Sequence, residues 1–254
     1  AIEYSREFDL TNDSQLFLKR VDCEANGYIR DELNRWLKGP WRNETSSPSP
    51  DVAISADGTS SISLSEVEHA QHTHKKGRKV QGHAALVPLY KGRMIWQFNY
   101  SYAVDVSQNR RAKWENTNGT LNPIVSEHLV PCEFVSGPRL RLGFRDIQNA
   151  TNRRTMIAAC IPNMACSNKV PNLSVNNGSE LALAAILNSF FIDNILRRKI
   201  SQGTINWFYV EELPLPNLDQ ASTYIEPLEF VSSCLSLTSP VFCQTWESLA
   251  NDFE

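Results

Sequence analysis

The spacing of the apolar residues changes once along this chain, and that change limits the folds it can adopt. Through residues 84–162, apolar and polar side chains alternate in several short runs, which is the pattern of strands with one buried face. Residues 179–199 then repeat apolar side chains at every third or fourth position, which is the pattern of an amphipathic helix. Several strands followed by a strong helix indicate an α+β fold. We therefore expect a mixed or mainly antiparallel sheet with helices packed against it.

The local sequence predicts the individual elements. We expect strands over 84–106 (two strands joined by a tight turn at Lys91-Gly92), 112–117, 128–135, 138–148, 156–162 and 205–216. We expect helices over 28–38 and 179–199, with one or two more in the acidic segment 225–254. We expect loops over 43–66, with one short strand at 52–55, and over 69–83. The apolar residues expected in the core are Leu140, Leu142, Phe144, Ile157, Leu187, Phe190, Trp207 and Phe208.

Charge is segregated along the chain, although the formal net charge is only −3. Residues 75–113 contain nine Lys or Arg and one acidic residue, and residues 139–199 contain nine and three. Residues 1–74 are acidic overall, and residues 205–254 contain eight acidic residues and no Lys or Arg. A basic, arginine-rich middle is typical of phosphate binding. The alternative is a solvated basic face with acidic segments folded against it.

Cysteine usage and hydropathy favour a cytoplasmic protein. The six cysteines show no C-x2-C spacing, so we expect reduced thiols rather than a zinc ribbon or a disulfide framework. No window approaches the ~18 consecutive apolar residues of a membrane span, so no membrane partner is expected. The start Ala1-Ile2-Glu3 lacks a signal peptide and an initiator Met. This start fits either a fragment of a larger protein or removal of the initiator Met.

No familiar catalytic motif occurs in the sequence. It lacks a glycine-rich dinucleotide fingerprint, a Walker loop, H-E-x-x-H, G-x-S-x-G, an N-P-P-Y-type motif and a nuclease-type PD…E-x-K. The strongest metal candidate is the histidine cluster of His69, His72, His74 and His83, because His-rich tracts can bind metals. Basic neighbours would repel a dication, and no carboxylate or cysteine completes a usual ligand set. We therefore assign no metal site and no catalytic residue; a hydrolase built on these histidines is the alternative.

Three stretches of the chain resemble a known family. They are REFDLTNDSQLF (6–17), LVPLYKGRMIWQFNYSYA (86–103), and PRLRLGFRDIQNATNRRTMIAACIPN (138–163) with its continuation ALAAILNSFFIDNILRRKISQGTINWFYVEELPLP (182–216). Together they are similar to the target recognition domain of large adenine-N6 DNA methyltransferases and single-chain restriction-modification enzymes of bacteria. The chain departs from that family at Asn99-Tyr100, where an Asp-His pair is more usual. These two positions are therefore given no role.

The resemblance implies that residues 1–216 form a DNA target recognition domain, with a variable insertion at about 21–85, and that residues 217–254 form an acidic helical C-terminal segment. The implied function is to bind double-stranded DNA and to position a catalytic domain located elsewhere in the full-length protein. This chain alone would not be an enzyme. The full-length protein would be a site-specific adenine DNA methyltransferase, with or without restriction endonuclease activity. S-adenosylmethionine would bind only to an upstream methyltransferase domain, and a linked nuclease or helicase domain is a further expected partner.

Basic residues on loops and strand faces are the expected DNA contacts, because Lys and Arg bind backbone phosphates. They are Lys75, Lys76, Arg78, Lys79, Arg110, Arg111, Lys113, Arg139, Arg141, Arg153 and Arg154. Arg145 and Asp146 are interpreted as a structural pair. The alternative function is a protein-interaction module of a restriction or phage-defence complex, which docks its partner through the acidic C-terminal segment and does not contact DNA.

Overall fold

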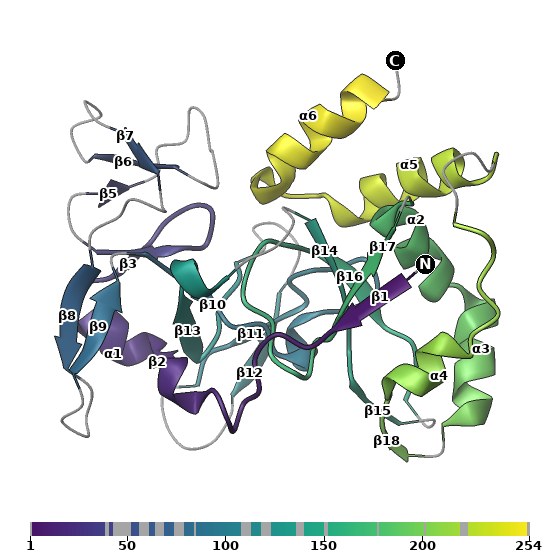
Figure 1. Ribbon diagram of the computed structural model, residues 1–254, viewed down its shortest axis with the longest axis horizontal. Coiled ribbons are helices and arrows are strands. Elements are labelled where there is room, and N and C mark those ends of the chain that lie inside the picture. The colour runs from purple at the N-terminus through teal and green to yellow at the C-terminus, as the bar shows by residue number, and fades with distance from the viewer. Residues whose placement is uncertain are drawn as a thin grey trace.

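The computed structural model has an α+β fold, as the change in apolar periodicity predicted. Its strands form antiparallel sheets, and most of its helices gather at one end of the molecule (Figure 1). The structure describes residues 2–38, 41–42, 52–55, 61–63, 69–73, 79–83, 85–107, 113–117, 123–135, 140–149, 152–176, 178–200, 202–218 and 223–252.

A four-stranded antiparallel sheet forms the centre of the fold. Leu142 lies opposite Cys160 on one neighbouring strand and opposite Leu173 on the other, so a row of buried side chains crosses the sheet. The strand expected over 156–162 is confirmed, whereas the one expected over 138–148 is divided between a strand of this sheet and a separate strand at 147–149. The order across the sheet is β1 (Ile2–Ser5), β17 (Asn172–Val175), β14 (Leu140–Phe144) and β16 (Ala158–Pro162).

A second sheet contains residues that the sequence predicted to be helical. The helix expected over 28–38 is wrong, because this segment forms two short strands around a turn. In that turn the Asp31 carboxylate accepts hydrogen bonds from the backbone N and the Nε of Arg35, both at 2.7 Å. An Asp side chain that binds nearby backbone competes with helix formation. The strand order is β2 (Leu18–Lys19), β13 (His128–Pro131), β10 (Ala85–Pro88), β4 (Trp36–Leu37) and β3 (Ile29–Arg30).

The remaining strands form smaller antiparallel groups. Strands β8 (His69–Thr73) and β9 (Lys79–His83) pair with each other, so the loop expected over 69–83 is wrong for both of these arms. Their polar composition hid them, since backbone pairing does not require an apolar face. The strand expected at 52–55 is confirmed as β6 (Val52–Ser55). The others are β5 (Trp41–Arg42), β7 (Ser61–Ser63), β11 (Ala103–Asp105), β12 (Trp114–Asn116), β15 (Ile147–Asn149) and β18 (Gln202–Thr204).

Two helices replace the single one expected over 179–199. Helix α2 (Glu180–Leu187) ends at Asn188, and α3 (Phe190–Lys199) begins after Ser189, whose Oγ accepts a hydrogen bond from Ile192 N at 3.2 Å. A Ser with this bond is a helix N-cap, so the helix restarts here. Helix α2 packs against α5 and the central sheet (Figure 1). The other helices are α1 (Arg20–Ala25), α4 (Trp207–Glu211), α5 (Ile225–Ser236) and α6 (Cys243–Asp252).

The core contains most of the side chains expected in it. Leu142, Phe144, Ile157 and Leu187 are at most 1% exposed, whereas Leu140 and Trp207 are half-buried. Phe190 and Phe208 were wrongly placed in the core, since they are 84% and 49% exposed. Phe190 faces outward on α3 because the expected continuous helix breaks at Ser189. Phe208 faces outward because α4 is a helix, where a strand was expected.

All six cysteines are free, as expected for reduced thiols. Cys23, Cys160 and Cys166 fill the core, and burial raises the pKa of each of these thiols to about 12. Among the described helices, none has both the length and the apolarity needed to cross a bilayer.

Candidate nucleic-acid interface

Four of the expected DNA contacts have side chains that the structure describes: Lys113, Arg141, Arg153 and Arg154. Lys79 begins β9, and only its backbone is described. The other expected contacts lie outside the described residues, namely Lys75, Lys76, Arg78, Arg110, Arg111 and Arg139.

Arg141 faces the interior of the protein. Its Nη1 lies 2.8 Å from the Glu7 carboxylate, and its Nε donates to Asn163 Oδ1 at 3.0 Å. The same Glu7 oxygen accepts a hydrogen bond from Cys166 N at 2.8 Å. Burial raises the pKa of Glu7, although the charge of Arg141 opposes this shift. Arg141 therefore fastens the N-terminal segment to the central sheet, and we leave it out of the interface.

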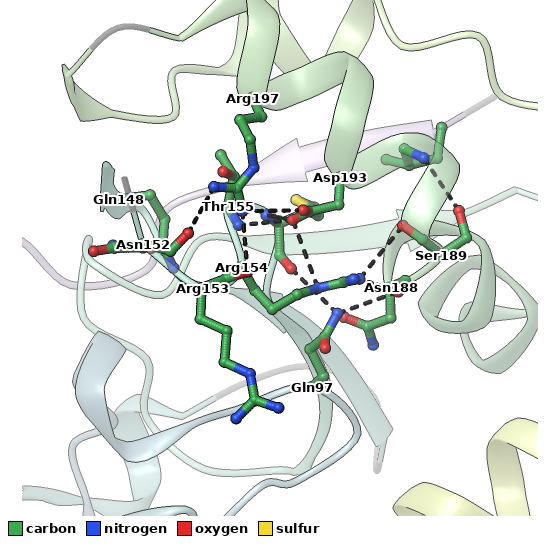
Figure 2. Close-up of polar contacts among 12 residues, drawn as sticks. Gln97, Gln148, Asn152, Arg153, Arg154, Thr155, Asn188, Ser189, Asp193 and Arg197 are labelled. Carbon is green, nitrogen blue, oxygen red and sulfur yellow. Dashed lines mark hydrogen bonds and ion pairs between the residues drawn. The ribbon is translucent and has the colours of Figure 1, made fainter. Parts of the chain in front are cut away.

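Arg154 is also buried, in a network centred on Asp193 of α3 (Figure 2). Asp193 Oδ1 accepts hydrogen bonds from Thr155 N at 2.7 Å and Met156 N at 2.8 Å. Its carboxylate forms ion pairs with Arg154 Nε at 3.7 Å and Arg197 Nη2 at 3.3 Å. The network holds helix α3 against the segment that leads into β16.

Asn188 connects the break between α2 and α3 to this network. Its carbonyl oxygen accepts hydrogen bonds from Arg154 Nη2 at 2.5 Å and Gln97 Nε2 at 3.2 Å. These buried polar side chains therefore stabilise the fold. Arg153 differs from them, because it is exposed and extends away from Asp193 (Figure 2).

A basic cavity of about 480 Å³ lies between segments far apart in the sequence. Four of its lining side chains are cationic, and within the described part of the chain no carboxylate lines it. Its walls combine these cations with one aromatic ring and two aliphatic side chains. The lining residues are Leu10, Lys91, Gly92, Arg93, Trp114, Arg145, Ile147 and Lys169.

Arg145 is a half-buried cation of this cavity. It donates from Nε to the Gly92 carbonyl oxygen at 2.8 Å and from Nη2 to the Ile95 carbonyl oxygen at 2.6 Å. Burial, together with the positive charge of Arg93, lowers the pKa of Arg145 to about 10, so it remains charged at neutral pH. The structure shows no ion pair between Arg145 and a described carboxylate.

The expected Arg145–Asp146 pair is therefore wrong. Successive residues at the end of β14 point in different directions, and Asp146 instead pairs with Lys169 at 3.4 Å and Arg6 at 3.7 Å. Burial raises the pKa of Asp146, against the charges of these two cations.

Lys91 and Gly92 form one rim of the cavity. Lys91 Nζ lies 3.0 Å from both Asp105 and Glu127. Burial opposes ionisation of Asp105, but hydrogen bonds from Ser107 and the charge of Lys91 outweigh it and lower the pKa of this carboxyl. Gly92 does not form the expected hairpin turn, since it begins the 3-10 helix η3 (Gly92–Met94).

Gly92 instead allows the neighbouring segments that contain Lys169 and Arg145 to approach its backbone closely. A Cβ atom at Gly92 would lie 3.0 Å from the Lys169 carbonyl oxygen and 3.3 Å from Arg145 Cγ. The absence of a side chain thus lets the Lys169 and Arg145 segments meet at the cavity.

Arg93 and Trp114 form another part of the cavity wall. The Arg93 guanidinium lies over the Trp114 ring, 5.8 Å from its centroid, which is a cation–π geometry. Arg93 is exposed, and no ion pair joins it to a carboxylate of the described residues. Next to Trp114, Lys113 is exposed and pairs with Glu115 at 3.0 Å on the surface. Such exposed pairs are weak, so Lys113 remains available to a ligand.

The sequence did not indicate Lys91, Arg93, Trp114 or Lys169 as interface residues. Each of the three cations stands apart from the runs of adjacent basic residues, and Trp114 is uncharged. The only signal was Lys91-Gly92-Arg93 within the second resembling stretch. No described group of His, Cys, Asp and Glu could hold a metal ion; the side chains of the histidine cluster lie outside the description.

Comparisons of the chain with protein-family models, with curated proteins and with solved structures each gave no match.

Proposed function

We propose that this chain is the DNA sequence-recognition module of a restriction-modification or phage-defence adenine-N6 methyltransferase. The observation that carries the proposal is the basic cavity, in which Arg93 and Arg145 have no carboxylate partner among the described residues. A concave, positively charged site with an aromatic wall suits a phosphate-bearing polymer. Arginine suits this role because its planar fork binds phosphate oxygens in pairs.

The surroundings of the cavity support a larger basic surface. Lys113 lies two residues after the basic Arg110-Arg111 pair and directly precedes Trp114 of the cavity wall. Phosphate contacts from such residues would fix the orientation of the module on the duplex, and base contacts in the major groove would select the sequence.

Catalysis belongs to another domain in this proposal. The chain has no catalytic motif and the resemblance covers only a recognition domain, so a covalently linked methyltransferase domain would bind S-adenosylmethionine and flip the target adenine. A linked nuclease or helicase domain would add restriction. Such a protein acts on cellular and invading DNA in the cytoplasm.

The test is the affinity of the purified chain for duplex DNA at several salt concentrations, measured by fluorescence anisotropy. Each phosphate neutralised by Lys or Arg releases counterions, so log K should fall with log salt by about 0.9 per contact. Tight binding that weakens steeply with salt supports the proposal. Absence of binding at low salt contradicts it.

Helix α5 favours a second candidate function, a protein-interaction module. Val231 and Leu235 lie one turn apart and are 53% and 50% exposed, and Phe230 beside them is 51% exposed. Contiguous exposed apolar side chains often mark protein contacts. Substitution of Val231 and Leu235 with Asp would weaken a protein complex and leave DNA affinity unchanged. The second candidate would be favoured if the wild-type chain binds no DNA and if this double substitution abolishes its binding to a partner protein.

A further inference from the structure

We propose that the basic cavity binds one nucleotide unit, with its phosphate against Arg93, Arg145 and Lys169 and its base or sugar against Trp114. This inference rests on the proposed function where the nucleotide belongs to a DNA strand. The same chemistry would also accept a free nucleotide.

The unpaired positive charge in the cavity favours binding of an anion. Lys91 is neutralised by Asp105 and Glu127, each 3.0 Å away. Lys169 shares Asp146 with a second cation. Arg93 and Arg145 have no such compensation within the described residues. Two cationic charges therefore remain unbalanced beside a partly desolvated cavity, where an anion is bound more strongly than in open solvent.

The geometry of Arg145 favours a phosphate over a simple ion. Two of its nitrogens, Nε and Nη2, are occupied by the Gly92 and Ile95 carbonyl oxygens, which fix the plane of the guanidinium. No described residue accepts a hydrogen bond from its Nη1, which leaves that nitrogen for a ligand. Arg93, which lies over the Trp114 ring, supplies a complete planar fork. The Arg93 fork and Arg145 Nη1 together offer several N–H donors to the oxygens of a phosphate.

The size and apolar lining favour a nucleotide over a lone phosphate. The cavity of about 480 Å³ falls in the ~300–1,000 Å³ range of small-molecule sites, and a phosphate would fill only part of it. Leu10, Ile147 and Trp114 line the remainder, and the Ile147 side chain is 57% exposed. Aromatic rings of this kind stack on nucleic-acid bases with little sequence preference. Deoxyadenylate and thymidylate should therefore both bind.

The first measurement is calorimetry of the chain with deoxyadenosine 5′-monophosphate, thymidine 5′-monophosphate and the two unphosphorylated nucleosides. We expect both monophosphates to bind at least tenfold more tightly than their nucleosides. Inorganic phosphate should bind more weakly than either monophosphate, because it cannot contact the apolar walls.

The second measurement uses Arg93→Ala, with Arg30→Ala as a control of equal charge change. Arg93 is exposed and makes no hydrogen bond in the described structure, so the variant should melt at the temperature of the wild type. Arg30 is exposed on β3 and does not line the cavity. Arg93→Ala should weaken monophosphate binding at least tenfold, Arg93→Lys should restore part of it, and Arg30→Ala should leave it unchanged.

Titrations with duplex DNA and with mononucleotides together distinguish a nucleotide within a DNA strand from a free nucleotide. They also distinguish failure of the cavity site from failure of the proposed function. Monophosphate binding that needs Arg93 supports the cavity site, even if the chain binds no duplex and the proposed function fails. Duplex binding that Arg93→Ala weakens tenfold more than Arg30→Ala supports a nucleotide supplied by the DNA strand, even if free monophosphates do not bind. If neither ligand distinguishes Arg93→Ala from Arg30→Ala, the cavity inference is overturned, while duplex binding by the wild type would leave the proposed function standing.

Discussion

The side chain of Asn188 exchanges two hydrogen bonds with the backbone of Ala158. Asn188 Oδ1 accepts from Ala158 N at 3.0 Å, and Asn188 Nδ2 donates to the Ala158 carbonyl oxygen at 2.9 Å. The amide thus pairs with β16 as a neighbouring strand would, at a position where the sheet has no further strand. It joins the break between α2 and α3 to the edge of the central sheet.

Replacing Asn188 with Ala should lower the free energy of unfolding by about 1–3 kcal/mol, because the buried Ala158 N–H would lose its partner, whereas the Ala158 carbonyl oxygen would keep its hydrogen bond from Phe98 N. Urea denaturation followed by circular dichroism measures this change. Asn194→Ala is the matched control, since Asn194 is exposed on the adjacent helix α3. Equal stability of the two variants would contradict the assigned role of the Asn188 amide.

Replacing Asp193 with Asn should lower the free energy of unfolding by about 3–5 kcal/mol, because it leaves buried Arg154 without its ion-pair partner. The exposed Glu226 provides the control, and Glu226→Gln should change stability little. Chemical denaturation measures both. A loss below about 1 kcal/mol for Asp193→Asn would show that the network contributes less than its geometry indicates.

Gly92→Ala should disturb the cavity more than it disturbs the rest of the fold. The added methyl would press on the Lys169 carbonyl oxygen and Arg145 Cγ, at an expected cost of about 1–3 kcal/mol. Gly27→Ala is the comparison, because a Cβ at Gly27 meets no atom within 4 Å and only its φ of 87° opposes the change. Both variants should be less stable, but only Gly92→Ala should weaken duplex binding.

The Lys75, Lys76, Arg78 and Lys79 quadruple Ala variant tests the expected DNA-binding loop. If these residues contact phosphates, the slope of log K against log salt should become shallower by about two to four units. Uniform weakening across DNA sequences would indicate phosphate contacts, and loss of sequence preference would indicate base contacts. A quadruple variant that binds like the wild type at every salt concentration would remove this loop from the interface.

Thiol reactivity should follow burial. The exposed Cys234 should react first with a thiol reagent at pH 8, whereas Cys23, Cys160 and Cys166 should react only on unfolding.

The raised pKa of the three buried thiols should also make the free energy of unfolding depend on pH. Above pH 9.0, their unperturbed pKa, the unfolded chain loses these protons while the folded chain keeps them up to about pH 12. These thiols should therefore make the free energy of unfolding fall as pH rises from 9 toward 12. Comparing the alkaline denaturation of the wild type with that of a Cys→Ala variant at one of these positions would check this.

The fold class could be predicted from sequence because apolar periodicity reports which faces are buried. The same rule failed for Arg141, which alternates with Leu140 and Leu142 and was expected to face outward. Strand β14 is covered on both faces, by helix α2 on one and by the segment containing Glu7 on the other, so alternation no longer separates core from surface.

The cavity could not be predicted because its walls come from five segments that lie far apart in the sequence. Leu10, Arg93, Arg145 and Lys169 meet only through the tertiary fold. Local patterns also misassigned 205–216, where aromatic and β-branched residues favoured a strand, but helix α4 forms. Intrinsic strand preference is weak, and packing against α3 overrides it.

The position of β1 in the central sheet affects how the chain folds during synthesis. Ile2 pairs with Val175, and Ser5 pairs with Asn172. Of the strands in this sheet, β1 is translated first and therefore has no partner until β17 has been translated, which takes about 10–35 s at ~5–20 residues per second. Closure of the central sheet by β1 therefore waits for a contact between residues about 170 positions apart, and such long-range pairing is a late and slow step of folding.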